Sequence, residues 1–243
     1  MNLSIIDHNL KYDYVLRKKT LFYRYLPYQI RKKFIRRVKN FIDNHDFEGH
    51  EGLAVTDEMR ILVSAAAVHL TLGLSDYEMR DFRRIFIYPD VYYSGYSKTI
   101  NRGETNSHGI ITLTWRFVEE GFDDQSDKKN LGYHEFAHAL LLQHSGGMLN
   151  DRNFDLGYEQ FCYMIREEHL AHRVEEAGFI RDYAFTNIME FFAVSAECFL
   201  ESPEVMKEKS PELFSAMMHM LRQDPIKREY GLSFIDFSFW DPE

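Results

Sequence analysis

The amino-acid sequence predicts a mostly helical α+β protein with a small sheet. Several long stretches repeat their apolar residues at helical spacing, whereas only two short runs have the β-branched and aromatic composition of strands. Hydrophobic residues make up 45% of the 243 positions and include 20 Phe and 15 Tyr. That amount of bulky apolar material excludes a disordered chain and is enough for a sizeable core.

Apolar spacing and capping residues predict where the helices lie. Residues 28–44 alternate an apolar face with a basic one. Thr56 is expected to cap the next helix, because Asp57 and Glu58 follow it, and Gly73 is expected to end that helix after Leu72. Further helices are expected over 132–144, 157–176, 187–200 and 211–222.

The two strand-like runs cover residues 84–88, which stop at Pro89, and residues 110–115. The glycine-containing stretch 47–53 and the acidic stretch 119–130 are expected to be loops. We find no internal repeat or linker that marks a boundary. A single domain over 1–243 is therefore expected, with a basic helical arm over 1–45 packed on it.

The basic arm contrasts with the rest of the chain. Between Tyr14 and Ile42 there are ten Lys or Arg and no acidic residue; the remaining 19 basic residues face 38 acidic ones, a balance of −19. An acidic body argues against general nucleic-acid binding. We expect the basic face of residues 28–44 to be the solvated side of a packed helix. The alternative is a docking surface for an acidic partner or a membrane.

The cysteines and the longest apolar stretches of the sequence indicate the cellular compartment of the protein. Cys162 and Cys198 both lie in apolar helical patterns, which is typical of reduced thiols rather than of a disulfide framework. Residues 1–16 lack the apolar stretch of a signal peptide, and the run from Ile61 to Leu74 is too short to span a bilayer. We expect a cytoplasmic protein without a membrane span.

An HExxH motif lies inside the helix expected over 132–144. His134 and His138 are four residues apart and share one helical face, so both imidazoles can reach a single ion. Glu135 projects toward the same place. In zinc peptidases the glutamate of this motif takes a proton from the water that attacks the substrate. Such peptidases commonly bind an extended substrate along the sheet edge nearest the metal, and the strand at 110–115 is the candidate here.

A third ligand has several candidates. His144 has the spacing of a third histidine, but Leu141 stands where a turn-forming glycine would be needed, so the helix should carry His144 away. His169 and His172 share a face that is expected to be solvated. Glu190 and Glu197 lie seven residues apart in an apolar helix, where unpaired carboxylates are costly.

Glu190 is therefore expected to bind the metal, and Glu197 to accept a hydrogen bond from a ligand imidazole. The alternative for Glu190 is a capping box with Asn187, which would close the N-terminus of the helix expected over 187–200.

The segments HEFAHAL and EFFAVSAE resemble the catalytic half of the Mlc titration factor family of bacterial zinc peptidases. That family is itself similar to the catalytic domain of anthrax lethal factor. The segments VTDEMRILVSAAAVHLTLGL, IFIYP, RGETNSHGIITLTW, ESPEVMKEKSPELF and RQDP resemble the family in the same order. The resemblance covers residues 22–225. The chain departs from the family in its basic arm, in the Leu-rich continuation after His138 and in residues 226–243.

The resemblance implies a gluzincin-type fold in which one Zn²⁺ per chain is bound by His134, His138 and Glu190. It implies Glu135 as general base and Tyr183 as a hydroxyl that reaches the reacting carbonyl. It also implies an aminopeptidase-like zinc metallopeptidase acting on a peptide or protein substrate, with a transcriptional repressor as a further partner. The alternative is a non-catalytic regulator that sequesters a protein partner and holds zinc structurally.

Overall fold

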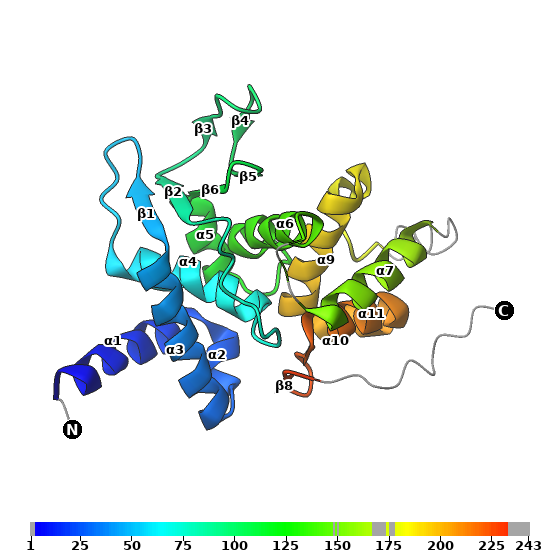
Figure 1. Ribbon diagram of the computed structural model, residues 1–243, viewed down its shortest axis with the longest axis horizontal. Coiled ribbons are helices and arrows are strands. Elements are labelled where there is room, and N and C mark those ends of the chain that lie inside the picture. Colours follow the sequence, from blue (N-terminus) through cyan, green and yellow to red (C-terminus); the bar gives the residue numbers. More distant parts are fainter. Residues whose placement is uncertain (1–2, 148, 150, 167–173, 175–177, 233–243) are drawn as a thin grey trace.

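The computed structural model describes residues 3–147, 149, 151–166, 174 and 178–232. Within them the protein is mostly helical with a small mixed sheet, which confirms the predicted α+β class. In Figure 1, α6 crosses the middle of the molecule, with α1–α3 on one side and α7, α10 and α11 on the other. The helices are α1 (Leu3–Lys19), α2 (Leu21–Tyr25), α3 (Tyr28–Asn44), α4 (Asp57–Leu70), α5 (Trp115–Asp123), α6 (Leu131–Ser145), α7 (Arg152–Arg166), α9 (Ile188–Glu201), α10 (Pro203–Lys209) and α11 (Pro211–Leu221), with a 3-10 helix η1 at Asp182–Thr186.

The main sheet has four strands in the order β1-β2-β6-β5. The first three strands of this order run parallel, and β5 pairs antiparallel with β6 at one edge. Two pairs of short strands, β3 with β4 and β7 with β8, stand apart from the main sheet. The strands are β1 (Asp46–Gly49), β2 (Arg84–Tyr88), β3 (Tyr92–Tyr93), β4 (Ile100–Asn101), β5 (Gly103–Asn106), β6 (Ile110–Thr114), β7 (Gln223–Asp224) and β8 (Glu229–Tyr230).

The edge strand beside the motif helix is β5, and here the expectation is wrong. Residues 110–114 do form a strand, but β6 is interior, paired with β2 on one side and with β5 on the other. The α6 helix packs against both β5 and β6. The register places Gly103 opposite Leu113 and Thr105 opposite Ile111. The four-residue β5 is therefore the strand that borders the motif.

Helix α4 fills the centre of the molecule and is buried along nearly its whole length. It packs against α1, α3 and α6. Small residues allow α6 to approach it closely, since a Cβ added at Gly132 would come within 2.7 Å of the Ala66 Cβ. The apolar residues of α1 to α11 belong to one buried cluster. Within the described residues, none of the helices combines the length and apolarity that crossing a membrane requires.

Several element predictions are confirmed. Helix α3 has the predicted bounds, and the hydroxyl of Thr56 caps α4 by accepting a hydrogen bond from the Met59 amide at 3.2 Å. The strand at 84–88 is also confirmed. Helix α7 begins at Arg152 instead of Gly157, and most of residues 167–176, over which the same helix was expected, lie outside the described residues.

Two expected loops are partly regular structure. Residues 115–123 form α5, because Val118 and Phe122 lie on one face of a helix that buries them despite the acidic residues between them. Residues 46–49 form β1, which extends the sheet beyond β2.

The basic face of α3 is also not uniformly solvated. The guanidinium of Arg37 is buried and donates to the carbonyl oxygens of Thr71, Leu72 and Leu74 at 2.9, 3.1 and 2.7 Å. The ammonium group of Lys33 donates to Leu72 O at 3.1 Å. These two cations satisfy carbonyls where α4 ends, a position that favours positive charge. They hold α3 on α4 and are not available to a partner.

Candidate metal centre

The HExxH motif lies in the buried middle of α6. The helix begins after Asn130, whose side-chain oxygen accepts a hydrogen bond from the Tyr133 amide at 3.1 Å. His134 and His138 follow one turn apart, with ring centroids 4.7 Å apart and ring planes at 89°. Neighbouring apolar residues bury the rest of the helix. Both rings are therefore held on one face of a rigid element, as a metal site requires.

Glu190 comes to the same point from α9. The Asn187 side chain caps that helix by accepting hydrogen bonds from the amides of Met189 and Glu190 at 2.9 and 3.0 Å. The Glu190 carboxylate turns toward the motif instead of completing a capping box. Its Oε2 lies 3.1 Å from His134 Nε2, and its Oε1 lies 3.5 Å from His138 Nε2. The three side chains form the one group of potential metal ligands found among the described residues.

The facing atoms of this group require a cation or a proton between them. His134 donates its Nδ1 hydrogen to Oε1 of Glu197 at 2.7 Å, because a carboxylate only accepts. With Nδ1–H committed to Glu197, a neutral His134 ring would present its lone pair at Nε2, 3.1 Å from the Oε2 of Glu190. That oxygen is buried and has no hydrogen-bond donor in the described structure. Two imidazole nitrogens and one carboxylate oxygen are a donor set that suits a divalent metal such as zinc.

The pKa shifts of His134 and Glu190 also indicate that a positive charge is favoured between these side chains. Burial works against charging of His134, but the carboxylates of Glu190 and Glu197 outweigh it and raise the pKa of His134 to about 10. Burial alone would raise the pKa of Glu190, yet the two imidazoles hold that pKa well below its usual range. The residues present thus fit a metal cation.

Glu197 anchors the first imidazole and is itself held from two directions. Its side chain is buried, and its Oε2 accepts a hydrogen bond from the backbone amide of Asn130 at 2.8 Å. Arg181 closes on both carboxylate oxygens, with Nη2 2.6 Å from Oε1 and Nη1 3.0 Å from Oε2. The two-pronged pair holds the carboxylate of Glu197 in place and so fixes the ring of His134.

Glu135 lies on the side of α6 that faces β5. Its buried carboxylate accepts a hydrogen bond from the Thr105 hydroxyl at 2.9 Å. Burial raises the pKa of Glu135, while the nearby His134 and His138 work in the opposite direction. A Cβ at position 103 would come within 2.5 Å of the Glu135 Oε1, so Gly103 leaves the space that this carboxylate occupies. A raised pKa suits a group that takes and returns protons.

Tyr183 lies in η1, at the rim of the same site. Its side chain is 54% exposed, and its ring centroid lies 6.3 Å from that of His134. Partial burial, together with the charge of Glu190 and a hydrogen bond to it, raises the pKa of Tyr183 to about 12. The hydroxyl therefore keeps its proton at neutral pH and remains a hydrogen-bond donor.

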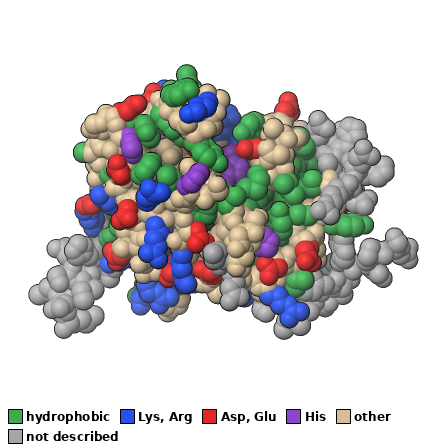
Figure 2. Space-filling view, turned by 45° about the horizontal axis from the view of Figure 1, so that its top comes forward, with side chains coloured by type: hydrophobic (Ala, Val, Ile, Leu, Met, Phe, Trp, Pro, Cys, Tyr) green, Lys and Arg blue, Asp and Glu red, His purple; other side chains and the backbone are tan. Residues whose placement is uncertain are grey.

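These groups open into a cleft of about 700 Å³. Ile100, Gly103 and Phe117 supply part of its wall, and His134, Glu135 and Tyr183 lie at its metal end. In Figure 2, histidine side chains are visible from outside in a recess of the surface. A larger cavity of about 880 Å³ lies on the N-terminal helices and contains none of these residues, so size alone does not locate the site.

The other histidine candidates lie elsewhere. Helix α6 continues through Ser145 and carries His144 to α7, where its Nδ1 lies 3.2 Å from Asp155 and its ring packs against Phe154 and Tyr158. The pair His169 and His172 lies outside the described residues. Cys162 and Cys198 are not joined in a disulfide in the described structure, and Cys198 is buried.

Sequence reasoning missed Arg181 and Thr105. No motif marks either residue. The one available signal was Glu197 itself, because a buried carboxylate in an apolar helix requires more positive charge than a single shared imidazole provides. Thr105 belongs to β5, a strand too short to be recognised from its composition.

The fold and the site together define a class: proteins in which an HExxH helix beside a small sheet meets a glutamate from a later helix. The family model described as glucose-regulated metallo-peptidase M90 matches residues 7–222, and the chain belongs to that family. Membership suggests a metallopeptidase.

Relatives support the same assignment at low identity. An uncharacterized protein of Synechocystis is 26% identical over 231 residues, which cover 87% of this chain and 83% of the relative. Mlc titration factor A of Pectobacterium atrosepticum is 28% identical over 198 residues, 72% of each chain. Mlc titration factor A of Klebsiella pneumoniae is 26% identical over 222 residues, 82% of each chain. The resemblance to the Mlc titration factor family is thereby confirmed.

Proposed function

We propose that the chain is a zinc-dependent metallopeptidase of the gluzincin type with aminopeptidase-like activity. The observation that carries this proposal is the convergence of His134, His138 and Glu190, in which Glu190 Oε2 is buried without a hydrogen-bond donor. One Zn²⁺ per chain would satisfy that oxygen and both imidazoles. Glu135 lies beside the three ligands without belonging to them, as a general base must.

Each remaining residue has a role in hydrolysis. Bound zinc would activate the attacking water and polarise the peptide carbonyl. Glu135 takes the proton of that water and returns it to the leaving amine. The Thr105 hydroxyl holds the carboxylate of Glu135 in position for both transfers. Tyr183 donates a hydrogen bond to the carbonyl oxygen as negative charge develops on it.

The free edge of β5 supports an extended substrate. Gly103 of this strand lines the cleft together with residues of the motif helix, and the outer side of the strand is not paired with another strand of the described structure. A peptide could add to this edge by backbone hydrogen bonds. Its scissile carbonyl would then lie beside Glu135 and Tyr183. The absence of a side chain at Gly103 keeps this approach open.

A regulatory role is the second candidate. Two of the relatives named above are Mlc titration factor A, a name that implies binding of a regulator called Mlc. We propose that a transcriptional repressor is a second partner of this chain, that the chain acts in the cytoplasm and that it works as one domain. The buried cluster that runs from α1 to α11 supports the single domain. A non-catalytic regulator with structural zinc is the alternative to the peptidase.

Hydrolysis of amino-acid and peptide anilides, with and without chelator, tests the proposal. The parent protein should contain close to one zinc per chain and lose activity on chelation. Glu135→Gln should keep the metal and lose hydrolysis, whereas Glu58→Gln, at a partly exposed glutamate of α4, should change neither. A Glu135→Gln protein as active as the parent would refute the mechanism. A zinc-loaded parent with no activity on any substrate would favour the regulator.

A further inference from the structure

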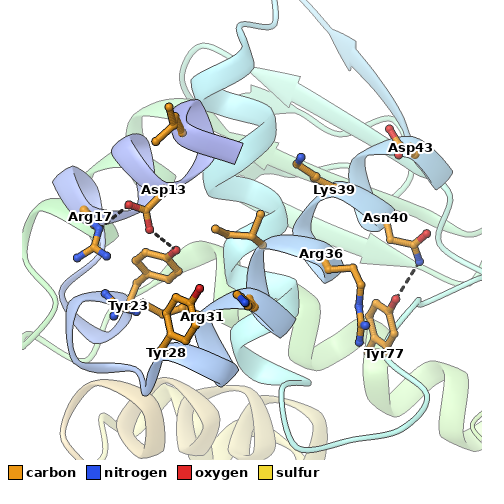
Figure 3. Close-up of a pocket in the computed structure, with 13 residues that line it drawn as sticks. Asp13, Arg17, Tyr23, Tyr28, Arg31, Arg36, Lys39, Asn40, Asp43 and Tyr77 are labelled. Carbon is orange, nitrogen blue, oxygen red and sulfur yellow. Dashed lines mark hydrogen bonds and ion pairs between the residues drawn. The ribbon is translucent and has the colours of Figure 1, made fainter. Parts of the chain in front are cut away.

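A groove between α1 and α3 forms a second large cavity, remote from the metal centre. It holds about 880 Å³. Figure 3 shows Arg17, Tyr23, Tyr28 and Arg31 toward one end of the groove, and Arg36 beside Tyr77 at the other. Helix α4 lies between α3 and α6, so the groove and the cleft occupy different sides of the core. The groove is lined by Leu10, Asp13, Arg17, Tyr23, Tyr28, Arg31, Lys32, Ile35, Arg36, Lys39, Asn40, Asp43 and Tyr77.

The residues that line the groove carry a net positive charge. Five Lys or Arg line it against two carboxylates. One of these, Asp13, is occupied by Arg17 at 2.6 Å and by the Tyr23 hydroxyl at 2.7 Å. Arg31 contributes a buried Nε that has no hydrogen-bond partner among the described residues. Lys32 and Arg36 are exposed one turn apart, unlike the neighbouring Lys33 and Arg37, which hold α4.

The shape of the groove indicates an elongated ligand. Its residues recur every three or four positions along α3, from Tyr28 to Asp43. The helix rises roughly 22 Å from Tyr28 to Asp43, the length of about seven extended residues. Apolar contacts are also provided, by Leu10 and Ile35 and by the 60% exposed ring of Tyr28. A compact anion would leave most of this length unfilled.

We propose that the groove binds an acidic peptide segment of another protein, one that alternates carboxylates with large apolar side chains. A second copy of this chain fits less well. Two cationic grooves repel each other, and a groove placed on the acidic body of another copy gives a head-to-tail contact that does not close. An anionic membrane presents a flat surface, whereas this positive charge lines a recess. Charge complementarity and length both favour the acidic segment.

A labelled synthetic peptide of about ten residues, with alternating glutamate and leucine or phenylalanine, tests the proposal. Fluorescence anisotropy should show binding that weakens as salt rises from about 0.05 to about 0.5 M. Lys32→Glu with Arg36→Glu should weaken binding at least about tenfold. These exposed positions make no hydrogen bond that the fold needs, so the variant should melt at the temperature of the parent.

The matched control reverses two exposed lysines outside the groove, Lys18→Glu with Lys227→Glu, and so gives the same change in net charge. It should leave binding within about twofold of the parent. Equal loss in both variants would reduce the effect to net charge and overturn the proposal. Absence of peptide binding to the parent would also overturn it. So would a variant Lys32→Glu with Arg36→Glu that still binds the peptide but no longer binds phosphatidylglycerol vesicles or a second copy of the chain. Anilide hydrolysis should be unchanged in both variants, so the result is independent of the proposed peptidase.

Discussion

The Nδ1 atom of His134 lies 2.7 Å from the carboxylate of Glu197, and this contact determines what His134 presents to the centre of the site. Because the Nδ1 hydrogen is donated to Glu197, the neutral form of the ring, which is the form that binds a metal, has its lone pair at Nε2. Arg181, the residue before η1, donates to both oxygens of the same carboxylate. The arrangement links α6, η1 and α9 through one buried ion pair.

Glu197→Gln should weaken metal binding by about 10- to 100-fold, the usual effect of losing a carboxylate that orients a ligand imidazole. The amide that replaces the carboxylate carries no charge and leaves the cation of Arg181 unbalanced. Competition with a chromogenic chelator measures the affinity. Arg181→Lys should cause a smaller loss, because it keeps the charge and loses the two-pronged geometry. Unchanged zinc affinity in Glu197→Gln would show that the contact does not serve the metal.

Tyr183→Phe should lower kcat by ~10²-fold or more and leave the zinc content unchanged, since it removes one hydrogen-bond donor to the developing oxyanion. The ring and its packing beside His134 are retained. Tyr93→Phe, which removes the hydroxyl of a 65% exposed tyrosine on β3, is the matched control and should have full activity. Turnover of Tyr183→Phe equal to that of the control would remove Tyr183 from the reaction.

A pH dependence of stability is expected from Glu201. Burial, reinforced by the charge of Glu197, raises the pKa of Glu201 from 4.5 to about 8. A carboxyl whose folded pKa is raised holds its proton more tightly in the folded state. Its stabilising contribution is therefore complete below about pH 4.5 and is lost as the pH rises through about 8. The Tm of the parent should fall over this range.

Glu201→Gln should flatten that fall, because it removes the titrating group and can still accept the hydrogen bond that Asn130 donates to Glu201 at 3.1 Å. Glu204→Gln, an exposed neighbour on α10, should follow the parent. Thermal melts of the three proteins across the range make the comparison. Parallel curves for the parent and Glu201→Gln would contradict the expectation.

Elements with strong periodicity or capping chemistry could be predicted from the sequence. Helix α3 and the Thr56 cap of α4 are examples, because local spacing alone determines them. The placement of His134 and His138 on one helical face could likewise be predicted from their spacing. Glu190 could be proposed because a carboxylate in an apolar helix needs a partner, and the structure brings it to both imidazoles.

The features that escaped prediction depend on tertiary contacts. β5 has four residues and becomes a strand only by pairing with β6. Thr105 and Arg181 serve the site from elements that carry no motif of their own. Arg37 looks like its basic neighbours in the sequence, but α4 places three carbonyl oxygens where it can reach them. The groove between α1 and α3 likewise exists only once both helices are in place.

The ligand set is the central claim, and zinc content after dialysis against a mild chelator tests it most directly. Glu190→Ala leaves two imidazoles and should lose the metal, although Asn187 still caps α9. His144→Ala should retain one zinc per chain and full activity, because α6 carries His144 to Asp155. Retention of zinc by Glu190→Ala together with its loss from His144→Ala would contradict the assignment of His134, His138 and Glu190.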